Sequence, residues 1–372
     1  MARRLLAGGQ IFAPGLMRFW EHEFYGRAGG LMGLQAPSWQ PASKNDVAFL
    51  VLPPRGKWDE SVQQRLKGLL GGKAALFAVG RRDDLPAGVP SNRFEGFTGG
   101  VKSQEGLYGL GEHRPLAPLR LLEIIVRGWI AAGEMICACI RGGKMPVIWM
   151  SAWLEGSFIR NISFIEQDNL REPWSAPLFH KGRYIPPLPP GCAAEHFLGM
   201  LGRIRESLAG QGDRLAQAGK WLAEAHQAGR RPWTVLVGHS YPLILQLPGE
   251  DKQRPVYPLR WGPSVSDLAR ALPGDLKRGD VVMHLGYGPV NVPAAREILG
   301  RGIRLIHTTP YGRPPGMKPQ RNFLWLDLPW RPSDASVDVP GYGVRILPSS
   351  SSAQTMALLA ILSEMADRMG WS

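Results

Sequence analysis

Short apolar runs that alternate with helix-length amphipathic segments are the feature that most constrains this chain. The run DVAFLVLP at 46–53 is apolar without interruption, which is typical of a strand buried on both faces of a parallel sheet. WDESVQQRLKGLLGG at 58–72 follows, with acidic residues in its first turn and glycines at its end, as in a helix. AALFAVG at 74–80 is the next expected strand. Strands separated by helices need crossover connections, so the sequence predicts an α/β fold with mainly parallel sheets.

The alternation runs through both halves of the chain. In the first half we also expect strands at 10–15 and 146–153 and helices at 17–30 and 116–141. The second half repeats the plan, with expected helices at 193–229 (one or two), 292–302 and 349–369 and strands at 234–240, 280–288, 304–310 and 322–328. The order of elements repeats although the two halves do not align residue by residue.

A proline-rich stretch separates the halves. REPWSAPLFHKGRYIPPLPPG at 171–191 holds six prolines, which favour an extended, semi-rigid connection and cannot continue a helix. A chain of 372 residues is long enough for two domains, each with its own core. We therefore predict a first domain at 1–165, a linker at 166–191 and a second domain at 192–372.

The net charge of the chain indicates what kind of ligand it can bind. The net charge of +13 suits anionic ligands. The basic residues are scattered in short runs without interleaved aromatic residues, so we expect a solvated surface and no nucleic-acid partner.

The three cysteines, Cys137, Cys139 and Cys192, are too few for a disulfide framework and are interpreted as buried thiols in a reducing compartment.

The sequence offers no signal for a membrane, a metal or a cofactor. The most apolar stretch, 124–140, contains Arg127 and Glu134 and falls short of a membrane span. The first residues lack the apolar core of a signal peptide, so we expect a cytoplasmic protein without a membrane partner. No spacing of His, Cys and Asp suggests metal ligands, and the glycine-rich stretch GVKSQEGLYGLG at 100–111 follows no clear strand, as a dinucleotide-binding loop would. We therefore predict neither a metal nor a cofactor.

Five segments, in this order, carry a resemblance to one known superfamily. The first half contains EFYGRAGGL at 23–31 and GGKMPVIWMSAWLEGSFIRN at 142–161, and the second half contains the segments 234–240, 278–310 and 337–362. They resemble the sugar isomerase (SIS) superfamily. The two segments of the first half are similar to the end of the family's first helix and to its closing segment. Those of the second half are similar to the first strand with its Gly-His-Ser turn, the following strand–helix–strand unit and the serine-rich entry to the last helix. The resemblance implies two three-layer α-β-α domains of flavodoxin-like or Rossmann-like type. Glucosamine-phosphate synthases and phosphoglucose isomerases have such a tandem arrangement.

The resemblance also implies a ligand. SIS proteins hold a sugar phosphate with serine and threonine hydroxyls and with backbone amides at helix N-termini, where the helix dipole favours an anion. We expect the ligand-binding residues to be Gly238, Ser240, Ser349, Ser350, Ser351 and Ser352, with Arg18 as a supplementary positive charge.

Two loops depart from the family's pattern. The family has a Ser-x-Ser loop at two places, which correspond here to LPPRGKWDES at 52–61 and GYGPVNVP at 286–293. Neither segment contains Ser-x-Ser. The turn APGLMR at 13–18 has no hydroxyl either. The sequence therefore predicts a phosphate cradle that is partial in the second half and largely absent from the first.

Two residues are candidates for catalysis. Glu23 precedes FYGR much as the catalytic glutamate precedes Leu-x-Gly-Arg in phosphoheptose isomerases, so the resemblance implies a base for aldose–ketose isomerisation. The alternative is that Glu23 only pairs with Arg27, four residues further along a helix. His239, in the turn after a strand, is a candidate for binding or orienting a ligand, or for a structural role. His284 and His307 fall on expected strands and are interpreted as satisfied core histidines.

Two functions of different classes follow. The first is sugar-phosphate binding with phosphosugar isomerisation as the candidate reaction, which Glu23, His239 and the serine run at 349–352 favour. The second is a catalytically inactive SIS-like protein that acts as a sugar-phosphate sensor or an assembly subunit, which the missing Ser-x-Ser loops favour. We also expect a homo-oligomer, because SIS proteins commonly assemble and the 13 tryptophans suit interfaces as well as cores.

Overall fold

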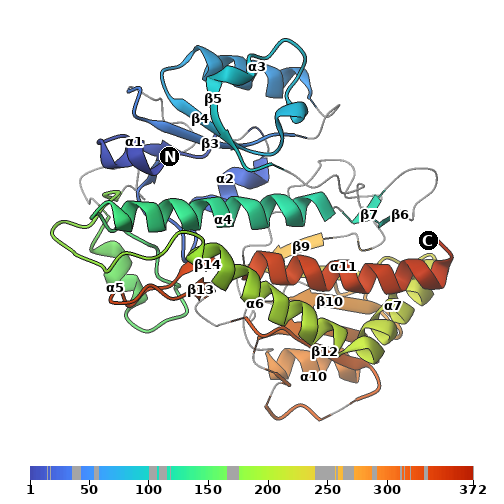
Figure 1. Ribbon diagram of the computed structural model, residues 1–372. Helices are drawn as coiled ribbons and strands as arrows, with labels where there is room; N and C mark the ends of the chain where they lie inside the picture. The colour runs from blue at the N-terminus through green and yellow to red at the C-terminus, as the bar shows by residue number, and fades with distance from the viewer. Residues whose placement is uncertain are drawn as a thin grey trace. The chain divides into compact units, whose positions relative to one another are not determined.

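The protein folds into two compact units (Figure 1). The computed structural model describes residues 1–14, 16, 18–35, 43–53, 58–99, 107–108, 115–117, 119–165, 176–238, 256, 259–262, 272–286, 291–310, 312–313, 315–318, 320–330 and 334–371. The first unit comprises Met1–Lys102, Glu123–Gly199 and Ser333–Ser349, and the second comprises Ser103–Leu122, Met200–Pro332 and Ser350–Ser372. Within the described residues, no helix is long and apolar enough to cross a membrane.

The units differ from the predicted domains in three short segments. Residues 103–122, predicted in the first domain, belong to the second unit. Residues 192–199 and 333–349, predicted in the second domain, belong to the first unit. The described part of the predicted linker, 176–191, is not a free connection. Leu178 O accepts a hydrogen bond from Val147 N at 3.0 Å, and Leu178 is buried in the first unit. Domain boundaries at 165 and 192 stay a prediction.

The first unit is built on a parallel sheet of five strands in the order β2-β1-β3-β4-β5. The strands are β1 (Ile11–Phe12), β2 (Leu34–Gln35), β3 (Val47–Val51), β4 (Ala75–Val79) and β5 (Phe94–Phe97). All five residues of β3 are buried, as its uninterrupted apolar run predicts. The predicted strands at 10–15, 46–53 and 74–80 are confirmed, with shorter bounds.

Helices cover both faces of this sheet. On one face α3 (Glu60–Gly71) places Leu66 against Phe12, Leu50 and Leu76, and the Asp59 carboxylate caps it by accepting from Val62 N at 2.8 Å. On the other face lies α2 (Arg18–Phe24), where Trp20 Nε1 donates to Phe49 O at 2.9 Å. Helix α4 (Leu119–Arg141) lies on that face too, and the Trp129 ring stacks on Phe24, with 4.0 Å between ring centres. The predicted three-layer arrangement is therefore present.

Smaller elements complete the first unit. They are α1 (Ala2–Leu6), the 3-10 turns η1 (Arg82–Asp84) and η2 (Ser91–Arg93), α5 (Ser157–Ile162), β13 (Ala335–Val337) and β14 (Ile346–Pro348). The predicted strand at 146–153 is wrong. Pro146 and Ile148 form only isolated antiparallel bridges, to Phe179 and Leu31, and Pro146 has no N–H to donate to a neighbouring strand.

The second unit repeats the topology of the first. Its five strands are parallel, and their order β9-β8-β10-β11-β12 follows the chain in the same way as β2-β1-β3-β4-β5. They are β8 (Trp233–Val237), β9 (Leu259–Gly262), β10 (Val281–Leu285), β11 (Arg304–Thr309) and β12 (Phe323–Asp327), and a separate short pair is β6 (Leu107–Tyr108) with β7 (Pro115–Ala117). The order 2-1-3-4-5 is that of flavodoxin-like folds. The repetition expected from the order of elements is confirmed.

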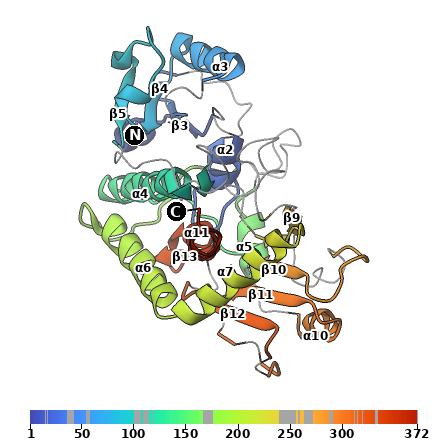
Figure 2. The same cartoon turned by 90° about the vertical axis from the view of Figure 1, so that its right-hand side faces the viewer.

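Helices also cover both faces of the second sheet (Figure 1). On one face α10 (Val292–Gly300) packs Ile298 against Val282 and Leu305. On the other face lie α7 (Gly212–Gln227) and α11 (Ser350–Met369), which run against each other; Figure 2 views α11 nearly end-on. The predicted helical segment at 193–229 is two helices, α6 (Cys192–Ala209) and α7.

The contact between α7 and α11 depends on one glycine. A Cβ on Gly219 would lie 2.5 Å from Glu364 Cβ and 2.7 Å from its backbone carbon. We expect Gly219→Ala to lower the free energy of unfolding by about 1–3 kcal/mol, because the helices must separate. Gly212→Ala, on the same helix with open space around it, is the control and should be neutral or stabilising. Urea unfolding of the two variants checks this, and equal effects would contradict it.

The three cysteines are free thiols. Cys137 and Cys139 are buried on α4, and burial raises the pKa of each thiol to about 12. Cys192, at the start of α6, is half-buried, which differs from the prediction of three buried thiols.

Candidate functional site at the start of the last helix

The serine run lies where the sequence predicts it, at the start of α11. Ser349 directly precedes the helix, and Ser350, Ser351 and Ser352 form its first turn. These four side chains, with Gln354 and Thr355 of the next turn, are at most 1% exposed. The first N–H groups of a helix have no partner within the helix, and its dipole places positive charge there. The start of α11 therefore combines oriented amides with hydroxyls.

Two of the hydroxyls are unusual. Within the described residues, Ser352 Oγ and Thr355 Oγ1 are buried and have no hydrogen-bond partner. Residues three apart on a helix lie on the same side, so Ser352 and Thr355 belong to one face of α11. Leaving a buried hydroxyl unpaired costs about 1–3 kcal/mol, and native proteins rarely keep two such groups together without a reason. A polar ligand with acceptor oxygens would satisfy both.

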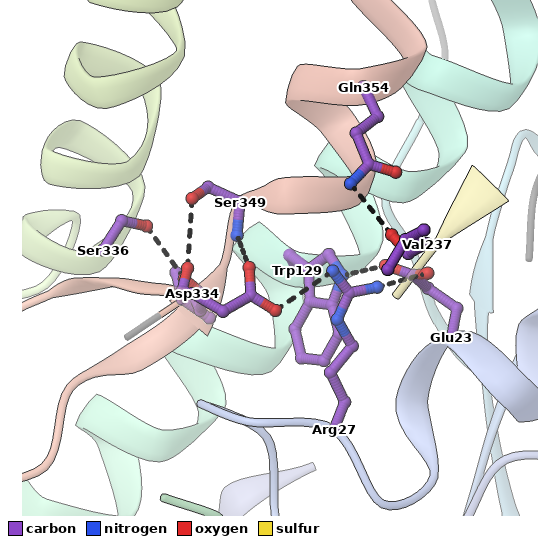
Figure 3. Close-up of polar contacts among 9 residues, drawn as sticks. Glu23, Arg27, Trp129, Val237, Asp334, Ser336, Ser349 and Gln354 are labelled. Carbon is purple, nitrogen blue, oxygen red and sulfur yellow. Dashed lines mark hydrogen bonds and ion pairs between the residues drawn. The ribbon is translucent and has the colours of Figure 1, made fainter. Parts of the chain in front are cut away.

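The second sheet places this helix start at a ligand-binding position. Gln354 Nε2 donates to Val237 O, the last residue of β8, at 3.4 Å (Figure 3). Gly238 follows with φ 87°, a left-handed conformation that glycine adopts without strain. Strand order reverses beside β8, where β9 lies on one side and β10 on the other. In open parallel sheets, ligands bind at the carboxyl ends of the strands beside such a reversal.

Two buried histidines lie side by side on β10 and β11. His284 Nδ1 and His307 Nδ1 are 2.7 Å apart, their rings are 9° from parallel, and both side chains are fully buried. Burial lowers the pKa of His284 to about 4, and burial together with the nearby His284 lowers that of His307 well below its usual value. Both rings are therefore neutral at pH 7. The prediction of satisfied core histidines is correct for Nδ1, whereas neither Nε2 has a partner among the described residues.

Glu23 lies in the first unit, inside its core. Its carboxylate forms an ion pair with Arg27 at 2.6 Å and accepts a hydrogen bond from Trp129 Nε1 at 2.8 Å, and both charged side chains are fully buried (Figure 3). Arg27 also faces Asp334 at 3.5 Å. The pairing of Glu23 with Arg27 is the alternative that the i, i+4 spacing offers. Two side chains already hold this carboxylate, so the geometry favours a structural role for Glu23.

Some predicted site residues cannot be placed. His239 and Ser240 lie outside the described residues, and α2 begins at Arg18 but the side chain of Arg18 is not among those described. In the second unit the structure places Gln354, one turn after the serine run, against Val237 at the end of β8. In the part of the chain that the structure describes, no three His, Cys, Asp or Glu side chains are grouped as metal ligands.

Sequence reasoning missed Gln354, Thr355 and Asp334. Thr355 follows Ser352 by three residues, so a helical reading of the serine run extends the hydroxyl face to it. Gln354 has no comparable signal, since its partner Val237 lies 117 residues away. Asp334 is 307 residues from Arg27, and no local pattern links the two.

Comparisons with known proteins identify the fold. No protein-family model and no curated protein matches the sequence. Among solved structures, the C-terminal domain of glucosamine-fructose-6-phosphate aminotransferase from Francisella tularensis matches with a TM-score of 0.50 and 10% identity, over 100% of this chain and 88% of that one. A candidate phosphosugar isomerase from Salmonella typhimurium matches with a TM-score of 0.46 and 11% identity, over 100% and 92% of the two chains.

The strand order defines a doubly wound α/β protein with two parallel sheets of the same topology. The fold is SIS-like, as the motif resemblance predicts. At 10% identity this likeness concerns the fold alone.

Proposed function

We propose that this protein binds a sugar phosphate through its second unit, with the phosphate at the first turn of α11. The observation that carries the proposal is the pair of buried hydroxyls, Ser352 Oγ and Thr355 Oγ1, which have no partner among the described residues. Phosphate oxygens accept hydrogen bonds from hydroxyls and from the backbone amides at a helix start, and the helix dipole favours their charge. The net charge of +13 adds an attraction for anions over the whole surface.

The fold supports a sugar as the rest of the ligand. The Francisella tularensis protein is named for a sugar phosphate, and it shares the fold over the full length of this chain. Gly238, after β8, has no side chain and allows close approach of a ligand to the backbone. We infer that the phosphate lies on α11 and the sugar at the carboxyl ends of β8 and β10.

Binding without chemistry is the function that the described geometry supports best. Aldose–ketose isomerisation needs a base that reaches the substrate, and Glu23 is fully buried and held by Arg27 and Trp129. This observation favours the sensor or assembly subunit over the isomerase. Conversion between an aldose phosphate and its ketose, followed by NMR, tests the reaction: turnover by the unaltered protein would establish the isomerase.

Because the Ser352 hydroxyl has no partner among the described residues, the binding proposal predicts that its removal lowers ligand affinity without lowering stability. We expect Ser352→Ala to leave the ligand-free protein equally stable or to stabilise it by up to about 1 kcal/mol, because an unsatisfied hydroxyl is removed and alanine favours a helix. The same variant should bind the sugar phosphate about tenfold more weakly. Thr355→Val should behave alike. A thermal-shift screen against hexose, pentose and amino-sugar phosphates, with and without each substitution, measures both effects.

Ser207 offers a matched control. Its hydroxyl, on α6, donates to Asp327 O at 2.7 Å, so it is already satisfied. Ser207→Ala should therefore lower stability by about 1 kcal/mol and leave ligand affinity unchanged. If Ser352→Ala also destabilises the protein and leaves affinity unchanged, the hydroxyl serves the fold and the binding proposal is wrong.

A further inference from the structure

The hairpin that leads into α11 carries backbone strain. Strands β13 and β14 pair antiparallel, and Ser336 Oγ donates to Leu347 O at 2.8 Å. Among the described residues, two that are not glycine have a left-handed backbone, Asp334 with φ 60° and Leu347 with φ 64°, and both are buried. Such conformations are unfavourable for side-chain-bearing residues and persist only where the surroundings impose them. Asp334 directly precedes β13, and Leu347 is the central residue of β14, three residues before Ser350 begins the helix.

Asp334 holds the residue that precedes α11. Its carboxylate Oδ1 accepts from Ser349 N at 3.2 Å, and its backbone oxygen accepts from Ser349 N and from Ser349 Oγ, each at 3.0 Å (Figure 3). The other carboxylate oxygen faces Arg27 at 3.5 Å. The hydroxyl proton of Ser349 is therefore used inside the protein, which sets Ser349 apart from Ser352.

We propose that Asp334 is a positioning residue for the phosphate site. It fixes the backbone of Ser349, and the next peptide bond leads into the turn that presents Ser350–Ser352. The inference rests on the proposed function. It adds that phosphate affinity depends on a side chain that does not itself contact the ligand.

Substitutions at position 334 distinguish a role of the Asp334 side chain in positioning Ser349 from a requirement for backbone conformation alone. Asparagine tolerates the left-handed backbone and keeps an oxygen that can accept from Ser349 N. Glycine keeps the backbone conformation but has no acceptor side chain. Alanine keeps neither. If the side chain positions Ser349, Asn should substitute for Asp and Gly should not, whereas a requirement for backbone conformation alone would be met by Gly.

The experiment measures affinity and local order in the four proteins with Asp, Asn, Gly or Ala at position 334. Affinity is measured by calorimetry with fructose 6-phosphate, and local order by hydrogen exchange of the 349–352 amides in the ligand-free chain. We expect Asp334→Asn to remain within about threefold of the original affinity, and Asp334→Gly and Asp334→Ala to lose about tenfold. The latter two should also exchange faster at 349–352. Full affinity and unchanged exchange in Asp334→Gly would overturn the proposal.

A control and a second readout keep the test decisive. Ser336→Ala removes a hydrogen bond of the same hairpin without touching Ser349, so it should change melting temperature but not affinity. An equal loss of affinity in Ser336→Ala would overturn the positioning role. If the original protein does not bind fructose 6-phosphate, the proposed function fails for that ligand, and unchanged exchange at 349–352 in Asp334→Gly would by itself overturn the positioning role.

Discussion

Replacing Arg27 by methionine is expected to lower the free energy of unfolding by about 3–5 kcal/mol, since it leaves the Glu23 carboxylate buried without its counter-charge. Both side chains are fully buried, and the pair is 2.6 Å apart. Trp129 Nε1 would remain as a donor to Glu23, but one neutral donor does not replace a cation. Urea unfolding of the variant measures the loss.

A second ion pair with the same spacing provides the control. Arg127 and Glu123 are also four residues apart, at 2.8 Å, but their side chains are 28% and 20% exposed. Arg127→Met should therefore cost about 1 kcal/mol or less. Similar losses for the two methionine variants would mean that burial does not set the strength of the Glu23–Arg27 pair, and the structural role given to Glu23 would lose its basis.

Acidification from pH 7 to pH 5 is expected to destabilise the protein through His284 and His307. Burial holds the pKa of both rings below the value of about 6.5 for an exposed histidine, with His284 at about 4. Above pH 6.5 neither the folded nor the unfolded state binds these protons, so the pair causes no pH dependence. Below pH 6.5 the unfolded state binds them first, and stability falls by about 1.4 kcal/mol per pH unit for each histidine until the folded-state pKa is reached.

The double variant His284→Leu with His307→Leu isolates this effect. Replacing both partners by apolar residues leaves no unpaired nitrogen, so the variant should fold, and its stability between pH 7 and 5 should fall less steeply than that of the original protein. His180, whose pKa burial and two nearby arginines lower to about 4, contributes the same slope to both proteins. Identical slopes in urea unfolding at pH 7, 6 and 5 would show that the pair is not the titrating group.

The parts of the fold that the sequence reveals are those governed by local chemistry. The apolar run at 46–53 can be buried on both faces only in a covered parallel sheet, and it forms β3. The serine run likewise predicts a helix start, because serine is favoured there and disfavoured inside helices. Of the strands in the two five-stranded sheets, β2, β5 and β9 were not predicted. The two residues of β2 are too few for a pattern, β5 contains Glu95 and Gly96, and β9 contains Arg260 and Gly262.

What could not be predicted depends on contacts between distant residues. No local sequence pattern indicates that residues 103–122 belong to the second unit and residues 333–349 to the first. The predicted role of Glu23 depended on a motif, and the motif does not tell whether its carboxylate faces a ligand or an arginine inside the core. The unpaired state of Ser352 and Thr355 likewise depends on all their neighbours, so only the folded chain shows it.

The measurement that tests the central claim most directly is calorimetry with glucose 6-phosphate, fructose 6-phosphate and glucosamine 6-phosphate, each beside its unphosphorylated sugar. The account predicts saturable binding of at least one phosphate, no binding of the matching free sugar, and an affinity about tenfold lower in Ser352→Ala. Absence of binding for all three phosphates, or equal affinity in Ser352→Ala, would contradict a phosphate site at the start of α11.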